Sequence, residues 1–370
     1  MAQRLILCEV RNRIGFITLN RPAALNALSL GMIQDLRSAL ANLACDPDIN
    51  AVLIRGAGEK AFCAGGDIRA IYDSYQNADG LHRDFFVTEY PLDYLMYSYP
   101  KPYIALIDGI VMGGGMGISQ GSRMRIVGDR TRMAMPEVAI GFFPDVGASY
   151  FLSRLPGCLG TYLALTGVQI RAADALYAGL ADAYLPRAGV EALDLELNAL
   201  VWPDPRSADR AAIAALIKKL AGRDLPAAPL AQFRPAIDEH FAASSIPTLL
   251  SSLEAESRPQ FLEWARSTLD LINTRSPTML AVTLEQLKRG KSMTLAQCLR
   301  MELGMVRQSF IQGDFIEGVR AMIIDKDNLP VWRPPHIDEV TEADIEEIFT
   351  DPWAGATHPL ATLEGIHACN

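Results

Sequence analysis

Residues 101–145 carry the strongest structural signal in the chain: KPYIALIDGIVMGGGMGISQGSRMRIVGDRTRMAMPEVAIGFFPD. An apolar run typical of a strand, Tyr103–Ile107, precedes a cluster of glycines within Gly113–Gly117. A second apolar run, Met124–Val127, leads to Glu137, and Asp145 follows eight positions later. Glycines let backbone N–H groups approach a ligand closely, and two carboxylates can transfer protons. We therefore expect these features to form one active site.

The same order of strand, glycine-containing loop and helix occurs earlier in the chain. The buried-type strand Ala51–Ile54 leads to a loop with Gly65 and Gly66, and Asp67 stands at the start of a helix. This pattern alone is also that of an ordinary turn with Asp67 as N-cap. Two such turns from adjacent parallel strands would place free N–H groups at one edge of a sheet, where ligands of α/β proteins bind.

Composition indicates a globular protein and argues against several classes of function. The chain has 370 residues, of which 50% are apolar and 21% charged, and its formal net charge is -9. An acidic chain is not expected to present a broad nucleic-acid-binding surface. The six cysteines are scattered without a C-x-x-C pair, and the five histidines form no H-E-x-x-H motif. We therefore expect reduced thiols and no metal site.

The N-terminus, MAQRLILCEVRNRIG, does not resemble a targeting segment. Its apolar run is too short for a signal peptide, and it lacks the Arg- and Ser-rich amphipathic character of a transit peptide. No stretch of the sequence reaches the length of a transmembrane helix. The sequence predicts a soluble, cytoplasmic protein with no membrane partner.

Strand patterns are confined to the first half of the chain, and helical periodicity dominates the second half. Proline-containing breaks occur at residues 201–205 and 225–229. We expect an α/β core with the active site over residues 1–200, a helical C-terminal region over residues 201–335, and a poorly ordered acidic tail over residues 336–370.

One motif competes with the glycine-and-carboxylate interpretation. Residues Gly117–Gly121 match G-x-S-x-G, the nucleophile elbow of serine hydrolases. That elbow needs its serine on a tight turn directly after a strand, whereas Ser119 lies inside the expected helix. The dinucleotide motif G-x-G-x-x-G and the P-loop motif are both absent from the sequence. A serine hydrolase and a nucleotide-binding protein are therefore weaker interpretations.

Three carboxylates are candidates for the chemistry. Glu137 and Asp145 each follow a proline in a loop, and Glu89 lies in an aromatic-rich helix. Glu137 and Asp145 could instead cap helices or form turns, and Glu89 could be solvated. If Glu137 and Asp145 share a cavity, repulsion and desolvation should raise at least one pKa, as acid/base catalysis often requires.

These motifs resemble those of the crotonase (enoyl-CoA hydratase/isomerase) superfamily. The resemblance extends over about residues 4–335. Its motifs are Asn20–Pro22 with Leu25–Leu28, Lys60–Asp67, Met112–Gly115, Met135–Glu137, Gly141–Gly147, Phe315, Glu317–Ala321, Ile324–Asp327 and Trp332.

The resemblance implies a fold and a substrate class. The superfamily fold is a spiral of ββα units with a helical C-terminal region. Its members bind the thioester carbonyl of an acyl-CoA in an oxyanion hole of two backbone N–H groups, which by motif position are those of Gly66 and Gly114. The implied partner is the acyl-CoA substrate, and no cofactor is implied because CoA is part of the substrate. Relatives form trimers or hexamers, so a homo-oligomer is also implied.

The departures from the superfamily pattern decide which reaction is implied. Hydratases carry a second catalytic glutamate where this chain has Gly117, and a small residue where it has Asp145. Ala23 stands where relatives often have a lysine that contacts the CoA phosphates. The pair Glu137 and Asp145, with Glu89 lining the acyl pocket, is that of a branch which hydrolyses short, branched 3-hydroxyacyl-CoA thioesters such as 3-hydroxyisobutyryl-CoA.

The resemblance therefore implies thioester hydrolysis, with Gly66, Gly114, Glu137 and Asp145 as catalytic residues. The same four residues and Glu89 are expected to bind the substrate. Glu137 would act either as a nucleophile that forms an anhydride or as a general base. Two alternatives stay open: an enoyl-CoA hydratase or isomerase, and a relative that binds acyl-CoA without catalysis.

Overall fold

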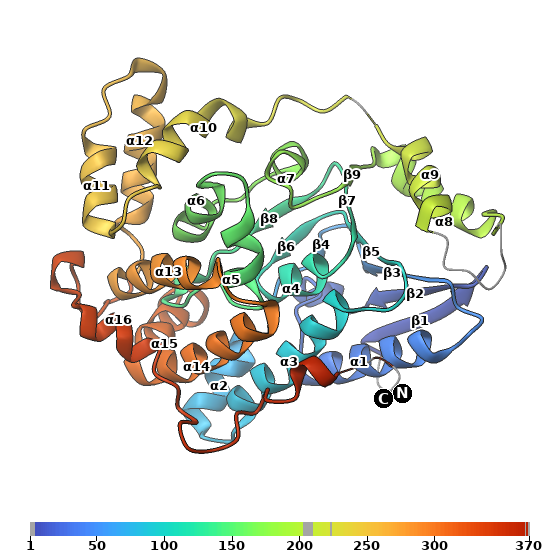
Figure 1. Ribbon diagram of the computed structural model, residues 1–370, viewed down its shortest axis with the longest axis horizontal. Coiled ribbons are helices and arrows are strands. Elements are labelled where there is room, and N and C mark those ends of the chain that lie inside the picture. The colour runs from blue at the N-terminus through green and yellow to red at the C-terminus, as the bar shows by residue number, and fades with distance from the viewer. Residues whose placement is uncertain (1–3, 203–209, 223, 367, 369–370) are drawn as a thin grey trace.

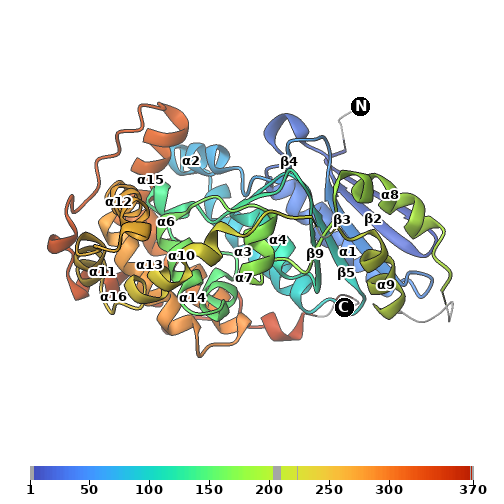
Figure 2. The same ribbon diagram turned by 90° about the horizontal axis from the view of Figure 1, so that it is seen from above.

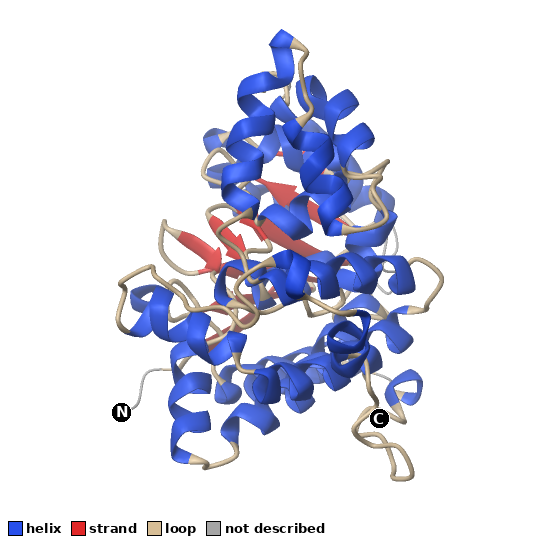
Figure 3. Ribbon diagram, turned by 90° about the vertical axis from the view of Figure 1, so that its left-hand side faces the viewer, coloured by secondary structure: helices blue, strands red, loops and turns tan. Residues whose placement is uncertain are grey.

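The structure, a computed structural model, describes residues 4–202, 210–222, 224–366 and 368. It has the expected α/β architecture, with two sheets and surrounding helices (Figures 1 and 2). In Figure 3 the strands lie between helices above and below them. The sheets come from the first half of the chain, and the second half is helical.

Helices occur in both halves of the chain. The α-helices are α1 (Leu30–Cys45), α2 (Ile68–Asn77), α3 (Leu81–Tyr97), α4 (Gly114–Gln120), α5 (Ala148–Phe151), α6 (Leu159–Thr166), α7 (Ala172–Ala178), α8 (Arg187–Asn198), α9 (Arg210–Leu220), α10 (Pro229–His240), α11 (Ile246–Glu254), α12 (Pro259–Ile272), α13 (Pro277–Gly290), α14 (Leu295–Gln312), α15 (Asp314–Val319) and α16 (Glu342–Ile348). Shorter turns are the 3-10 helices η1 (Pro22–Ala24), η2 (Glu137–Ile140), η3 (Leu152–Arg154), η5 (Ile337–Glu339) and η6 (Leu363–Gly365), and the π-helix η4 (Arg320–Ile324).

Side-chain caps fix where several of these helices begin. Ser29, an N-cap expected from the sequence, accepts a hydrogen bond from the Met32 N–H at 3.3 Å. Asp67 caps α2 by accepting from the Ala70 N–H at 3.2 Å. The capping interpretation of Asp67 is thus confirmed, and the glycine loop before it ends where α2 begins.

The larger sheet has six strands in the order β1-β2-β3-β5-β7-β9. They are β1 (Ile6–Arg11), β2 (Ile14–Leu19), β3 (Ala51–Gly56), β5 (Tyr103–Ile107), β7 (Met124–Val127) and β9 (Ala183–Tyr184). The antiparallel hairpin β1–β2 was expected, and its turn residues Asn12 and Arg13 have φ of 45° and 62°. The other neighbouring strands are parallel.

Helices cover both faces of the larger sheet. Phe16 and Leu53 belong to a core that includes residues of α8 and α9, whereas Ile17 and Ile54 belong to the main core with α1. This follows from the alternation of side chains along a strand. Figures 1 and 2 show α8 and α9 on one side of the sheet and α1 on the other. The inner strands β2, β3 and β5 are buried on both faces, which explains their continuous apolar runs.

The smaller sheet has three parallel strands, β4 (Ala61–Cys63), β6 (Ile110–Met112) and β8 (Arg132–Ala134). The sequence did not predict them, because three residues are too few to show a periodic pattern. They complete the units β3-β4-α2, β5-β6-α4 and β7-β8-η2. The expected spiral of ββα units is confirmed.

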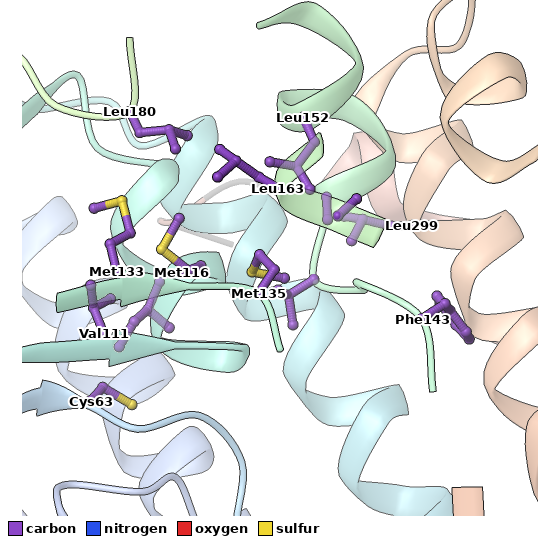
Figure 4. Close-up of a cluster of buried hydrophobic side chains, with 14 of the residues drawn as sticks. Cys63, Val111, Met116, Met133, Met135, Phe143, Leu152, Leu163, Leu180 and Leu299 are labelled. Carbon is purple, nitrogen blue, oxygen red and sulfur yellow. The ribbon is translucent and has the colours of Figure 1, made fainter. Parts of the chain in front are cut away.

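A dense core supports the smaller sheet. Cys63, Val111 and Met133, one from each strand, are almost fully buried, as are Met116 and Met135. Figure 4 shows these side chains in one cluster, with Met116 beside Val111 and Met133. The cluster holds the strands in place although each is only three residues long.

The acidic tail folds against the body of the protein. Within it, Ile348, Leu360 and Leu363 are buried, and the Leu360 carbonyl accepts a hydrogen bond from Arg300 Nε at 3.0 Å. Near the end of the chain, the Ala368 carbonyl accepts a hydrogen bond from Cys45 Sγ at the end of α1, at 3.5 Å. A few well-spaced apolar side chains thus pack the described part of the tail on the body of the protein despite its charge. The expectation that the tail is poorly ordered stays a prediction.

The main core draws residues from all three expected segments, including Ile17, Leu253 and Leu363. The division at residues 200 and 335 stays a prediction, and residues 203–205 of the expected break lie outside the described residues. In the described part of the chain, no helix is long and apolar enough to cross a membrane. Nor does any group of His, Cys, Asp and Glu side chains there form a metal cluster.

Candidate active site

Three parts of the candidate site follow the three strands of the smaller sheet. Gly66 comes shortly after β4, Gly114 after β6, and Glu137 after β8. Because these strands are parallel neighbours, their carboxyl ends meet at one edge of the sheet. The topology therefore brings together residues that are far apart in the sequence.

The backbones of Gly66 and Gly114 are in close proximity. A Cβ atom on Gly114 would lie 3.4 Å from the Gly66 backbone nitrogen and 2.5 Å from Glu89 Oε1. Gly114 therefore has no room for a side chain. As the first residue of α4, it has an N–H with no partner inside the helix. The two amides stand side by side at the edge of the site, as an oxyanion hole requires.

Glu137 begins η2 and is buried. Its Oε1 lies 2.8 Å from the point that a Cβ on Gly113 would occupy, so the glycine cluster also makes room for this carboxyl. Within the described residues, its Oε2 is buried without a hydrogen-bond partner. Burial, and next the nearby Asp145, raise the pKa of Glu137 well above its usual range.

Asp145 is buried and has a specific partner. The Tyr90 hydroxyl donates to Asp145 Oδ2 at 2.8 Å. Burial raises the pKa of Asp145 to about 7, and the Tyr90 hydrogen bond opposes that rise. Asp145 can thus exchange a proton near neutral pH. The sequence analysis missed Tyr90, although it adjoins Glu89 in the same aromatic helix.

Glu89 lies on α3 and is buried, so the solvated interpretation is wrong. Its Oε1 has no hydrogen-bond partner among the described residues. Burial is the main cause of a pKa well above the usual range of a glutamate, and the charge of Asp145 adds to it.

All five predicted site residues line one cavity of about 300 Å³. Its remaining wall is mainly apolar and includes Phe85, Phe86, Met112, Phe142 and Ile323. Apolar walls with a few convergent polar groups are typical of small-ligand sites. The cavity combines fixed N–H donors with carboxyls of raised pKa, which suits acyl transfer with acid/base steps.

The loop that carries Asp145 is held by the C-terminal helices, through two residues that the sequence analysis missed. Glu302 on α14 accepts from the Gly147 N–H at 2.7 Å and from the Ser149 N–H at 2.9 Å. Gln286 on α13 donates to the Pro144 carbonyl at 2.6 Å and to Ser149 Oγ at 2.8 Å. The available signal was Glu302 itself, a charged residue on the apolar stripe of a helix.

Two features of α4 bear on the alternatives from the sequence. Ser119 is fully buried within α4 and donates its hydroxyl to the Met116 carbonyl at 3.1 Å, so Gly117–Gly121 is no nucleophile elbow. A Cβ on Gly117 would lie 2.7 Å from both Asp93 Oδ1 and Val146 Cβ. The position that carries the second glutamate in hydratases therefore has no space for a side chain.

The fold and this cavity match one family of proteins. A family model described as enoyl-CoA hydratase/isomerase matches residues 14–349. The chain belongs to this enoyl-CoA hydratase/isomerase family. Among solved structures, it resembles a carnitinyl-CoA dehydratase from Mycobacterium thermoresistibile with a TM-score of 0.87 and 40% identity, covering 98% of this chain and 100% of that one. It also resembles an enoyl-CoA hydratase from Rhodobacter sphaeroides 2.4.1, with a TM-score of 0.83 and 35% identity. That match covers 94% of this chain and 98% of the other one.

Curated relatives carry a more particular name. The chain is 43% identical over 336 residues to the mitochondrial 3-hydroxyisobutyryl-CoA hydrolase of Xenopus tropicalis, covering 91% of this chain and 86% of that protein. It is 40% identical over 349 residues to the mitochondrial 3-hydroxyisobutyryl-CoA hydrolase of Homo sapiens, covering 93% and 88%. The 3-hydroxyisobutyryl-CoA hydrolase 1 of Arabidopsis thaliana is 37% identical over 357 residues, covering 94% and 92%.

Proposed function

We propose that this protein hydrolyses short, branched 3-hydroxyacyl-CoA thioesters, with 3-hydroxyisobutyryl-CoA as its main substrate. One observation carries the proposal: Glu137 and Asp145 line the same cavity as the amides of Gly66 and Gly114, while position 117 has no space for a second glutamate. The names of the curated relatives support the same choice.

The two amides would act on the thioester carbonyl. As water or a carboxylate attacks that carbon, negative charge develops on its oxygen, and the N–H groups of Gly66 and Gly114 would stabilise it. Such donors cost no reorganisation because the backbone already holds them. Losing one of them typically raises the barrier by about 3–4 kcal/mol.

Glu137 would begin the reaction by one of two routes. As a nucleophile, its carboxylate attacks the carbonyl carbon, the C–S bond breaks, and an anhydride forms that water then hydrolyses. As a general base, it takes a proton from water, and that water attacks the carbon directly. In either route the departing CoA sulfur takes up a proton. Asp145 would orient the water and move protons.

Glu89 would recognise the acyl group. Its unpartnered Oε1 lies beside Gly114, where it could hydrogen-bond the 3-hydroxyl of the substrate. The aromatic side chains of Phe85 and Phe86 would pack against the methyl branch. A polar group and an apolar wall in one cavity suit a short hydroxyacyl chain.

A thiol-release assay over a panel of acyl-CoAs tests the proposal. Wild-type protein should release CoA fastest from 3-hydroxyisobutyryl-CoA, and Glu137→Ala and Asp145→Ala should lose about 10²–10⁴-fold in kcat. CoA binding without thiol release, unchanged in Glu137→Ala, would instead identify a non-catalytic relative.

Labelled water distinguishes the two routes for Glu137. Under single-turnover conditions in water labelled with ¹⁸O, an anhydride hydrolysed at the Glu137 carbonyl carbon leaves the label in the Glu137 carboxyl. Mass spectrometry of the peptide that contains Glu137 would detect it. An unlabelled carboxyl removes the support for the anhydride route.

Hydration of an enoyl-CoA is the second candidate, since the solved relatives are named as a dehydratase and a hydratase. It would require Glu137 to act without a partner at position 117. The same panel decides between the candidates: strong hydration of a 2-enoyl-CoA with negligible CoA release would overturn hydrolysis.

We also propose a role in valine breakdown and a homo-oligomer, a trimer or a hexamer. Light scattering coupled to gel filtration would measure the oligomeric state, and growth on valine of a strain lacking the protein would test the pathway. The cytoplasmic location stays a prediction. Several curated relatives are named as mitochondrial proteins, which gives that location no support. Cell fractionation would test it.

A further inference from the structure

A second cavity lies behind the active site, on the other side of Val146. It has a volume of about 310 Å³, far more than the ~15 Å³ that one water needs. Its lining includes polar side chains, among them Gln120, Arg125 and Arg154. Tyr97, which is 39% exposed, also lines it, so the cavity reaches the surface. Because it reaches the surface, the cavity is accessible to bulk water.

Asp93 is the carboxyl at the inner end of this second cavity. It is only 4% exposed, and within the described residues neither of its carboxylate oxygens has a hydrogen-bond partner. Burying a polar group without a partner costs free energy, so no structural contact explains this side chain. Burial, and next the neighbouring Glu89, raise the pKa of Asp93 well above its usual range.

Asp93 is one helical turn away from Glu89. Residues at positions i and i+4 of a helix lie on the same face, with Cβ atoms about 5–6 Å apart. On the facing helix α4, Gly114 leaves room for Glu89 and Gly117 leaves room for Asp93. The two carboxyls therefore form a row between α3 and α4, from the active-site cavity to the second cavity.

The division between the two cavities is thin at this point. Val146, the residue after Asp145, lines both of them. Glu89 and Asp145 line the active-site cavity, and Asp93 lines the second one with both of its carboxylate oxygens buried. Besides burial, three neighbouring carboxyls raise the pKa of Asp93 through their charge: Glu89 on its own helix, Asp145, and Glu302 from α14.

Thioester hydrolysis leaves one proton to be removed. Water supplies its oxygen to the acyl carbon, the C–S bond breaks, and one water proton goes to the CoA sulfur. The second proton is released when the acid product ionises near neutral pH. The free acid and CoA still occupy the active-site cavity at this stage, so the proton needs another way to bulk water.

We propose that Asp93 is a proton-relay residue, which takes a proton from Glu89 and passes it to water in the second cavity. The inference rests on the proposed hydrolysis. Asp93 has no contact with the substrate and acts through Glu89. The second cavity is then the route by which protons leave, and water enters, while the thioester or its products occupy the first.

The test compares Asp93→Asn with Asp84→Asn, an exposed carboxyl in the first turn of the same helix. Asparagine keeps the shape of Asp93 but cannot carry the proton. CoA release would be measured in H₂O and in D₂O. We expect kcat of Asp93→Asn to fall about 10–100-fold, with KM within about twofold and a larger solvent isotope effect. Asp84→Asn should match wild type.

Chemical rescue separates a relay from a structural role. Asp93→Ala opens space beside the second cavity for formate, a small carboxylate that can carry protons. Formate should restore much of kcat in this variant, and chloride at the same concentration should not. Circular dichroism and thermal melting would check that both variants fold.

Two results would overturn the relay. In one, Asp93→Asn keeps the kcat and the solvent isotope effect of wild type. In the other, both variants lose activity with no change in isotope effect and no rescue by formate, which is the behaviour of a structural residue. Wild-type protein that releases no CoA from any thioester refutes the proposed function itself, and the relay with it.

Discussion

Two walls enclose the active-site cavity, and different parts of the chain hold them in place. The sheet wall is the edge where β4, β6 and β8 end, and it presents Gly66, Gly114 and Glu137. The helix wall is α3 with the loop after Phe143, and it presents Glu89 and Asp145. Backbone pairing fixes the sheet wall, whereas side-chain contacts from distant helices fix the helix wall.

The two walls therefore contribute different chemical groups to the site. Besides the Glu137 carboxyl, the sheet wall offers the backbone dipoles of Gly66 and Gly114, whose charge does not change with pH. The helix wall offers carboxyls whose protonation depends on burial and on one hydrogen bond from Tyr90. Substitutions in the sheet wall should therefore alter the barrier itself. Substitutions at the residues that support the helix wall, such as Tyr90 and Glu302, should mainly alter the pH dependence of kcat or the stability of the fold.

Gly114→Ala tests the sheet wall and should reduce activity more than a substitution at Glu302 or Tyr90. The new Cβ would lie 2.5 Å from Glu89 Oε1, so the Gly114 backbone and the Glu89 carboxyl must move apart. We expect kcat to fall about 10²–10³-fold, as when an oxyanion donor is lost. Gly31→Ala is the matched control, because a Cβ there meets nothing within 4 Å. Full activity in Gly114→Ala would show that this amide does not bind the thioester oxygen.

Glu302→Ala tests how far the helix wall depends on α14. It removes the acceptor for two backbone N–H groups of the loop after Asp145 and leaves a space in the core. We expect the free energy of unfolding to drop by about 2–4 kcal/mol, since buried donors lose their partner. Urea denaturation would measure the change. An unchanged midpoint would mean that α14 does not hold this loop.

Tyr90→Phe should have a smaller effect, which depends on pH. The Tyr90 hydroxyl opposes the rise in the pKa of Asp145, so its removal should raise that pKa above about 7. If Asp145 must be ionised, the acid limb of the kcat profile moves to higher pH, and kcat at neutral pH falls about 3–10-fold. Tyr94→Phe on the same helix is the control. An unshifted profile would exclude Asp145 as the group that titrates.

The smallest expected effect is on thermal stability. Burial raises the pKa of Asp145 to about 7 and that of Glu302 to about 8, whereas such groups titrate near pH ~4 in an unfolded chain. Between these values the folded protein binds more protons, so the free energy of unfolding falls as pH rises. We expect Tm to be a few degrees higher at about pH 6 than at about pH 8. Asp145→Asn should flatten this slope, and the same slope in both proteins would contradict the assignment.

The residues of the sheet wall were predicted from the sequence, whereas the strands that carry them were not. Gly66, Gly114 and Glu137 belong to local motifs, because a close backbone approach needs particular residues at particular spacings. The strands that carry them were missed, since three-residue strands have no readable period. They are held by a tertiary core around Val111 and Met133.

For the helix wall, the contacts that support the site residues could not be predicted from the sequence. Asp145 was proposed from its position after Glu137, and Glu89 from its aromatic-rich helix. The resemblance to a family then assigned both to the site, but their supports were not predicted. Tyr90 and Gln286 reach the site only through the folded structure, and Glu302 lies 157 positions after Asp145 in the chain. No local pattern encodes such contacts. The one sequence signal for these contacts was Glu302, a charged residue on the apolar face of a helix.

The contacts from Gln286 and Glu302 that hold the Asp145 loop have a consequence for synthesis on the ribosome. The two glycine turns and Glu137 are complete before α13 is made, but the contacts from Gln286 and Glu302 come from the last third of the chain. Since chains emerge N-terminus first, we expect the nascent protein to have its amide donors early and to stay inactive until α14 has left the tunnel. Stalled chains that end before α13 and after the C-terminus would show whether thioester cleavage begins at that point.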